Sequence, residues 1–434
     1  MNAKITARLV LLLCAASAVF FLVRGVVIGR SSASSAPSVS ASNALLVALN
    51  ERYPEPPPGQ NAATEFTKGF EALQLSKPAD IKLPAVGIPT PASLKVTYTS
   101  TILSNREALR HFAEGAKYQH CRYPIDLNAG IDLLLPHLAK LKNATLLLQI
   151  TAVVHADARQ PKLAANDVLT ALALARSLDD EPPLLSQLTR AGSIALTVSA
   201  LEHVLNRVAL PAESLDQLNK QLTKMEAHQA DGKGFDAALL MESASTLALF
   251  STPMKLLDIL AGSKMPEAQR ASYSAHVREA AGLKQDRACY EDALDRVMAI
   301  RRQPFPARLQ ADALLEERVS DAANQKLLVA DLLLRGLKGS ASREAECLAR
   351  LRLAKTAVAV EHFRLTHTNQ YPTHLTQLNP DEMASDPFAC AALRYAPNGH
   401  GYLLYSIGPD LRDDSGQRLD GHKGDLVFAV TRRP

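Results

Sequence analysis

The chain has 434 residues, of which 47% are hydrophobic, 21% are charged and only 5% are aromatic, with no Trp. This length suits two or three domains, and the balance of hydrophobic and charged residues excludes a disordered chain. The formal net charge is +4, and residues 1–30 contain four basic residues and no acid. The rest of the chain is therefore balanced in charge. This argues against a nucleic-acid-binding protein, because such proteins concentrate Lys and Arg on one surface.

Residues 1–30 have the features of a membrane-targeting segment. An apolar run at residues 9–23 follows two basic residues, and it reaches Ile28 if Arg24 extends its charge to the lipid interface. That span has the ~20 residues that a transmembrane helix needs, which predicts a single-pass anchor. The alternative is a cleaved signal peptide, because the shorter run ends close to small residues at 31–33. In both cases the early positive charges predict that the rest of the chain is periplasmic, with the anchor in the bacterial inner membrane.

A spacer and a long helical region follow. Residues 31–60 are rich in Ser, Ala and Pro and lack periodicity, which predicts a linker. Residues 61–339 are dominated by Ala, Leu and helical spacing, which predicts an α-helical domain. The exception is a Pro-punctuated stretch at residues 77–101, in which residues 95–99 predict a lone strand or a sheet edge.

The pattern within this region predicts stacked helices. Apolar residues at helical spacing on both sides of Gln160-Pro161 predict a helical hairpin at residues 144–178. Acids and prolines at residues 179–183 then end one helix and begin another, which continues to Val204. Further helices are predicted at residues 62–75, 212–228, 235–262, 265–300 and 307–336. Because no second copy of the hairpin recurs at a fixed period, we expect a mainly α fold, either an irregular helical bundle or an α-solenoid.

Residues 340–434 predict a small α+β domain. A helix-periodic stretch at residues 343–365 ends near Asn369, a residue type that adopts the left-handed conformation after helices. Alternating patterns predict strands at residues 392–396, 402–407 and 426–430, and Asn398-Gly399 predicts a tight hairpin between the first two. The expected result is a long helix on a three-stranded antiparallel sheet.

The order of these parts resembles the C-terminal domain of the major pseudopilin of type II secretion systems. The shared features are the long helix, Tyr371-Pro372, Asp386-Pro387-Phe388 and the run at residues 401–410. The resemblance implies a pseudopilin-like head in the cell envelope, with a calcium-binding loop after its second strand. The N-terminal segment differs, because pseudopilins carry a Glu near the start of their hydrophobic helix. The whole chain also resembles a family of membrane-anchored bacterial proteins that share phrases such as the one at residues 120–126, and this likeness implies no activity.

Carboxylates are concentrated in the loop between the second and third predicted strands. Asp410, Asp413, Asp414 and Asp425 lie there together with several glycines. Ca²⁺ takes about six to eight oxygen ligands without strict geometry, and an acidic loop of this kind can supply them. The resemblance implies a ligand role for Asp410 in particular. Two interpretations stay open, a calcium site formed by these four residues and an acidic loop that is only solvated.

The chain contains none of the common catalytic motifs, such as HExxH, GxSxG or a glycine-rich phosphate loop. His120 and Cys121 are adjacent, but neighbours in sequence rarely face each other, so a catalytic pair is not favoured. Beyond the membrane segment, four cysteines lack the spacing of a metal site, and they suit either free thiols or widely spaced disulfides. The sequence favours a protein without enzymatic activity and leaves an enzyme open.

We interpret the chain as a membrane-anchored, extracytoplasmic scaffold that binds a protein partner of the cell envelope. A groove in the helical region would hold the partner, the head would supply a second contact surface, and a type II secretion-like assembly would be the context. The alternative is an envelope hydrolase with its site in a cleft of the helical region. A third hypothesis, copolymerisation of the head with a secretion fibre, conflicts with the missing pseudopilin N-terminus. The only cofactor expected is Ca²⁺, and no nucleic acid is expected.

Overall fold

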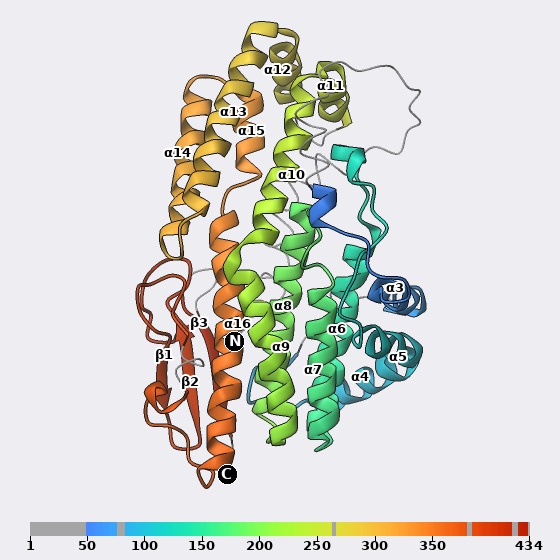
Figure 1. Ribbon diagram of the computed structural model, residues 1–434, viewed down its shortest axis with the longest axis vertical. Helices are drawn as coiled ribbons and strands as arrows, with labels where there is room; N and C mark the ends of the chain where they lie inside the picture. The colour runs from blue at the N-terminus through green and yellow to red at the C-terminus, as the bar shows by residue number, and fades with distance from the viewer. Residues whose placement is uncertain (1–48, 76–82, 263–265, 380–383, 419–423, 433–434) are drawn as a thin grey trace.

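The computed structural model describes residues 49–75, 83–262, 266–379, 384–418 and 424–432 (Figure 1). The chain is mainly helical with a small three-stranded antiparallel sheet near its C-terminal end, and at this level the predicted fold class is confirmed. The predicted anchor and most of the predicted linker lie outside the described residues. Within the described ranges, no helix is both long enough and apolar enough to cross a membrane.

Three short helices pack together beside the longer ones, at the right of Figure 1. They are α3 (Ala62–Ala72), α4 (Ala92–Ser104) and α5 (Arg106–Gly115). Glycine permits the close contact between α3 and α5, because a Cβ at Gly69 would overlap the ring of Phe112 and one at Gly115 would overlap the ring of Phe66. These rings belong to a core that continues into α6 and α7.

The prediction of a strand at residues 95–99 is wrong, because this segment lies within α4. Tyr98 is the buried residue of this helix. The hydroxyl of Thr97 donates to the Ser93 carbonyl (3.2 Å), and that of Thr101 donates to the Thr97 carbonyl (2.9 Å). The helix therefore satisfies these hydroxyls itself, and the weak strand propensity of Val and Thr yields to the packing of Tyr98.

Four long helices form the centre of the molecule. They are α6 (Pro136–Asp157), α7 (Pro161–Arg176), α8 (Leu184–Leu205) and α9 (Ala212–Asp231). The predicted hairpin is confirmed, since α6 and α7 pack against each other and the chain breaks at Gln160-Pro161. Pro161 occupies the first turn of α7, where its missing amide leaves no hydrogen bond unmade.

Further helices cover the upper end of the molecule in Figure 1 and enclose a second hydrophobic core. They are α10 (Lys233–Phe250), α11 (Pro253–Gly262), α12 (Glu267–Arg278), α13 (Ala280–Arg301), α14 (Gln310–Asn324) and α15 (Leu328–Arg335). The predicted stretches at residues 235–262, 265–300 and 307–336 are helical, but each is divided. The breaks fall before Pro253, at the extended Glu279 and at Lys326, which has a φ of +58°.

The longest helix, α16 (Ser340–Thr366), lies between the sheet and helices α8 and α9 (Figure 1). The sheet has the order β1 (Arg394–Pro397), β2 (Gly401–Ser406) and β3 (Leu426–Thr431), with both pairs antiparallel. The three predicted strands are confirmed. The predicted end of the long helix is also confirmed, because α16 ends at Thr366 and Asn369 has a φ of +63°.

The sheet shares one hydrophobic core with the central helices, including Phe428 of β3, Val358 of α16 and Leu201 of α8. The residue that follows α8 also covers the free edge of β3. Asn206, which follows α8, donates to the Ala429 carbonyl (2.7 Å) and accepts from the Thr431 amide (2.8 Å). An edge strand exposes unpaired backbone groups, and here an amide side chain pairs with them as a neighbouring strand would.

Candidate functional site

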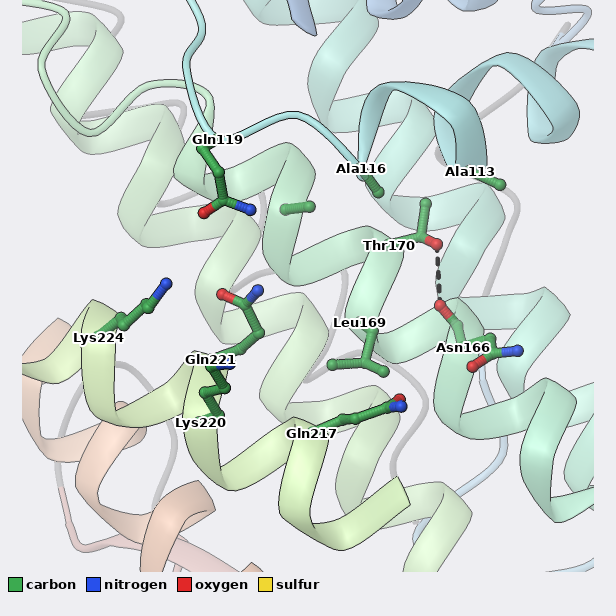
Figure 2. A pocket seen from close by; sticks show the side chains of 11 residues that line it. Ala113, Ala116, Gln119, Asn166, Leu169, Thr170, Gln217, Lys220, Gln221 and Lys224 are labelled. Carbon is green, nitrogen blue, oxygen red and sulfur yellow. Dashed lines mark hydrogen bonds between the residues drawn. The ribbon is translucent and has the colours of Figure 1, made fainter. Parts of the chain in front are cut away.

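A groove with a volume of about 720 Å³ lies between α5, α7 and α9 (Figure 2). Two helices form its facing walls. Asn166, Leu169, Thr170 and Ala173 come from α7, and Gln217, Lys220, Gln221 and Lys224 come from α9. Both sets have steps of three, one and three residues, which places each set on a single helix face. The walls are therefore two regular helix surfaces.

The third side of the groove comes from the end of α5 and the loop after it. Ala113, Ala116 and Gln119 line this side, and the two alanines leave the space open. Arg176 holds the loop in place, since its guanidinium donates to the Gln119 side-chain oxygen (3.2 Å) and to the Tyr118 carbonyl (2.8 Å). The position of Gln119 is therefore fixed from α7.

The lining of the groove is polar and cationic. It includes the amide side chains of residues 119, 166, 217 and 221 and the ammonium groups of Lys220 and Lys224, with no carboxylate among the lining residues. Both lysines are exposed, and neither has a hydrogen-bond or ion-pair partner within the part of the chain that the structure describes. The hydroxyl of Thr170 already donates its hydrogen bond to the Asn166 carbonyl (2.8 Å; Figure 2). The groove therefore offers amides and two unpaired cations to a ligand.

A second pocket of about 510 Å³ continues from the first and shares Gln119, Ala173 and Lys224 with it. Its other walls include residues 53–57 of the N-terminal segment, together with Cys121, Asp180 and His228. Burial raises the pKa of Asp180. Unlike the groove, this pocket combines carboxylates with cations, so its charge does not specify one class of ligand.

A buried hydrogen-bond network lies under this pocket. Glu181 has no exposed side-chain surface, and it accepts from the hydroxyls of Tyr53 (3.2 Å) and Ser186 (2.5 Å). His137 Nε2 lies 2.9 Å from one oxygen of Glu181, and the hydroxyl of Tyr53 accepts from the Tyr123 amide (3.0 Å). Both oxygens of Glu181 are thus occupied. The network joins the N-terminal segment to α6 and α8, as a structural tie would.

The adjacent His120 and Cys121 do not form a reactive pair. Burial, with a further contribution from Glu181, raises the pKa of Cys121 to about 12, which keeps the thiol protonated and unreactive at neutral pH. His120 is exposed, whereas Cys121 is partly buried. Cys121 and the three other described cysteines (Cys289, Cys347 and Cys390) are free thiols.

The carboxylates of the predicted calcium loop shape the loop itself. Asp410 accepts from the Gly424 amide (3.0 Å), and Asp425 accepts from the Gly416 amide (2.6 Å) and more weakly from the Asp414 amide (3.3 Å). Asp413 accepts from the Ser415 amide (3.0 Å), and one oxygen of Asp414 is buried with no hydrogen-bond partner.

Across the described ranges, no three His, Cys, Asp or Glu side chains are grouped to hold a metal. Calcium binding by Asp410, Asp413, Asp414 and Asp425 stays a prediction.

Sequence reasoning missed the residues of the groove. On α9, Gln217 and Lys224 have the spacing of an ordinary solvent-exposed helix face, and nothing in their pattern marks a binding surface. The only signal in the sequence was the same spacing of three, one and three residues in the two sets on α7 and α9. This spacing indicates a groove only once the two helices are known to be neighbours.

Comparison of the chain with protein-family models, with curated proteins and with solved structures finds no match. The resemblance of residues 340–434 to a pseudopilin head accordingly stays a prediction. The groove and its uncommitted side chains are the features from which a function can be inferred.

Proposed function

We propose that this protein is a membrane-tethered, extracytoplasmic binding protein that holds an extended segment of a partner protein in the groove between α5, α7 and α9. The observation that supports this most directly is the lining of that groove, where amides and unpaired lysines occur without any carboxylate. The tether and the compartment depend on residues 1–30, as interpreted from the sequence. A pseudopilin-like head, with or without bound Ca²⁺, would add a second contact surface in a secretion-like envelope assembly.

The side chains of the groove suit a polypeptide main chain. Each Gln or Asn offers both a hydrogen-bond donor and an acceptor, as an extended peptide backbone requires. The wall from Asn166 to Ala173 spans about 10 Å, because an α-helix rises ~1.5 Å per residue. A strand rises ~3.3 Å per residue, so about three or four peptide residues would contact this wall.

The part of the predicted linker that precedes the described residues is a poor occupant for this groove. Residues 31–48 contain no Asp or Glu, so they have no charge that complements Lys220 and Lys224. A separate partner therefore fits the groove better than the linker does.

An envelope hydrolase remains the alternative function. It would need titratable groups that a substrate can reach, and the His–carboxylate pair beside the second pocket is formed by Glu181 and His137. Glu181 is fully buried and both its oxygens accept hydrogen bonds, so a substrate would have to displace Tyr53 or Ser186 to reach it. This arrangement favours the binding function.

Site-specific photo-crosslinking in the cells that produce the protein tests this function. A photoreactive amino acid at Gln217 or Gln221 should give an adduct with one defined partner, and mass spectrometry should map the link to an extended segment of that partner. The matched control is Gln285 of α13, an exposed glutamine outside the groove. Adducts that are absent from the groove positions, or identical at Gln285, would overturn the proposal.

A further inference from the structure

Lys220 and Lys224 lie one helical turn apart on α9 and both line the groove (Figure 2). Side chains separated by four residues on a helix have Cβ atoms about 6 Å apart. Because neither lysine has a partner among the described residues, a ligand with two negative charges at a similar separation would pair with both. The groove therefore carries information about the spacing of charge in its ligand.

We propose that the groove recognises an extended acidic peptide with carboxylates at alternate positions, Asp/Glu-x-Asp/Glu. This inference depends on the proposed binding function and specifies its ligand. In a strand, residues two apart project to the same face and lie about 6.6 Å apart, which matches the two lysines. Neighbouring acids project to opposite faces, as do acids three apart, so only the alternate spacing presents both carboxylates to α9.

The remaining lining residues suit the other parts of such a peptide. Gln119 and Asn166 lie across the groove from the lysines and can pair with backbone amides and carbonyls (Figure 2). Ala113 and Ala116 are small, which allows the main chain to approach α5 closely. The lining of the groove contains no carboxylate that would repel the acidic side chains, whereas Asp180 lines the adjoining pocket, which shares Lys224.

The lysines are exposed, so each ion pair should contribute modestly and should be weakened by salt. We expect Lys220→Gln or Lys224→Gln to weaken binding by about threefold each and by about tenfold together. The matched control is Lys284→Gln on α13, an exposed lysine outside the groove, which should leave the affinity unchanged.

The test measures fluorescence anisotropy of labelled peptides with the purified full-length chain in a nonionic detergent. Three peptides of identical composition, GSETESG, GSEETSG and GETSESG, place two acids at separations of two, one and three residues, and GSKTKSG reverses the charge. We expect GSETESG to bind most tightly, GSKTKSG not to bind, and the preference for GSETESG to disappear in the double lysine variant. Raising the salt concentration should reduce the same preference.

Other outcomes separate this inference from the function beneath it. Equal binding of the three acidic peptides would overturn the spacing inference, as would tighter binding of polyphosphate or alginate than of any peptide. Binding of GSETESG that is unchanged by the double lysine variant would also overturn it. If no acidic peptide binds while Gln217 still crosslinks to a defined partner, the acidic ligand is wrong and the binding function stands. If the crosslink is also absent, both the acidic ligand and the proposed binding function are wrong.

Discussion

Helix α9 contributes to two regions whose charged side chains have opposite roles. On the groove side, Lys220 and Lys224 are exposed and unpaired within the described chain. At its other end and on another face, Gln229 donates to the main-chain carbonyl of Glu344 on α16 (3.3 Å), whose carboxylate is the centre of a buried ion-pair network. The charges at one end of α9 are paired within the fold, and those on the groove side remain available to a ligand.

The buried network joins five parts of the chain. Glu344 accepts from Arg301 (2.7 Å) and Arg308 (2.8 Å), and Arg301 also donates to Asp236 (2.7 Å). Gly232, between α9 and α10, makes room for these groups, because a Cβ there would lie 2.5 Å from a guanidinium nitrogen of Arg308. Every charge in this network faces a partner of the opposite sign. It stabilises the junction of α9, α10, α13 and α16 and leaves nothing for a ligand.

The largest expected effect comes from breaking this network. Glu344→Ala should lower the free energy of unfolding by about 3–5 kcal/mol, because it leaves the buried guanidinium of Arg308 without a carboxylate and that of Arg301 with Asp236 alone. Urea denaturation followed by circular dichroism measures the change. The matched control is Glu317→Ala on α14, an exposed residue that should change stability by less than about 0.5 kcal/mol. A similar loss of stability in the two variants would contradict the distinction between charges that are paired within the fold and charges that are exposed to a ligand.

A smaller effect is expected where the sheet meets α8. Asn206→Ala should cost about 1–2 kcal/mol, because the Ala429 carbonyl and the Thr431 amide lose their partner at the edge of β3. Water replaces part of this loss, since Thr431 is exposed. Hydrogen exchange resolved by residue should show faster exchange at Thr431, and Asn128→Ala, an exposed site far along the chain, serves as control. Unchanged exchange at Thr431 would show that the hydrogen bonds of Asn206 do not hold this edge of β3.

Acid should weaken the contact between α9 and α16 at Glu226. Burial acts to raise the pKa of Glu226, but hydrogen bonds from Lys355 (2.6 Å) and Arg352 (2.9 Å) outweigh it, so the pKa lies below its ordinary value of 4.5. A lowered pKa in the folded state adds stability that is present above pH 4.5 and is lost as the pH falls through the folded-state pKa.

The difference in free energy of unfolding between the native chain and Glu226→Gln should therefore shrink below pH 4.5. Denaturation at a series of pH values measures it. A difference that stays constant down to pH 3 would show that folding does not lower the pKa of Glu226.

The parts of the fold that could be predicted are those with strong local signals. Gln160-Pro161 breaks the α6–α7 hairpin, and Asn398-Gly399 turns the chain between β1 and β2, where Gly399 has a φ of +75°. The errors occur where tertiary packing overrides weak local preference. Residues 95–99 are helical because Tyr98 packs into the core from α4, and the break at Glu279 has no proline or glycine to announce it.

The candidate site could not be predicted in the same way. Gln119, Asn166 and Lys224 come from three elements, and only the packing of α5 and α9 against α7 brings them to one groove. The buried partners of Glu181 are equally separated, since Tyr53 lies 128 residues before it. Local periodicity predicts which face of a helix is polar, but it does not predict what lies opposite that face.

The smallest effect on stability is expected from the two lysines of the groove. The double variant Lys220→Gln, Lys224→Gln should change the free energy of unfolding by less than about 0.5 kcal/mol, because neither ammonium group has a partner to lose among the described residues. Removing two like charges one turn apart should stabilise α9 slightly. Urea denaturation of the double variant beside Lys284→Gln measures this.

If the double variant lowers the free energy of unfolding by several kcal/mol, these lysines stabilise the fold. If stability is unchanged and GSETESG binds more weakly, these lysines serve ligand binding, in contrast to the buried ion pairs around Glu344.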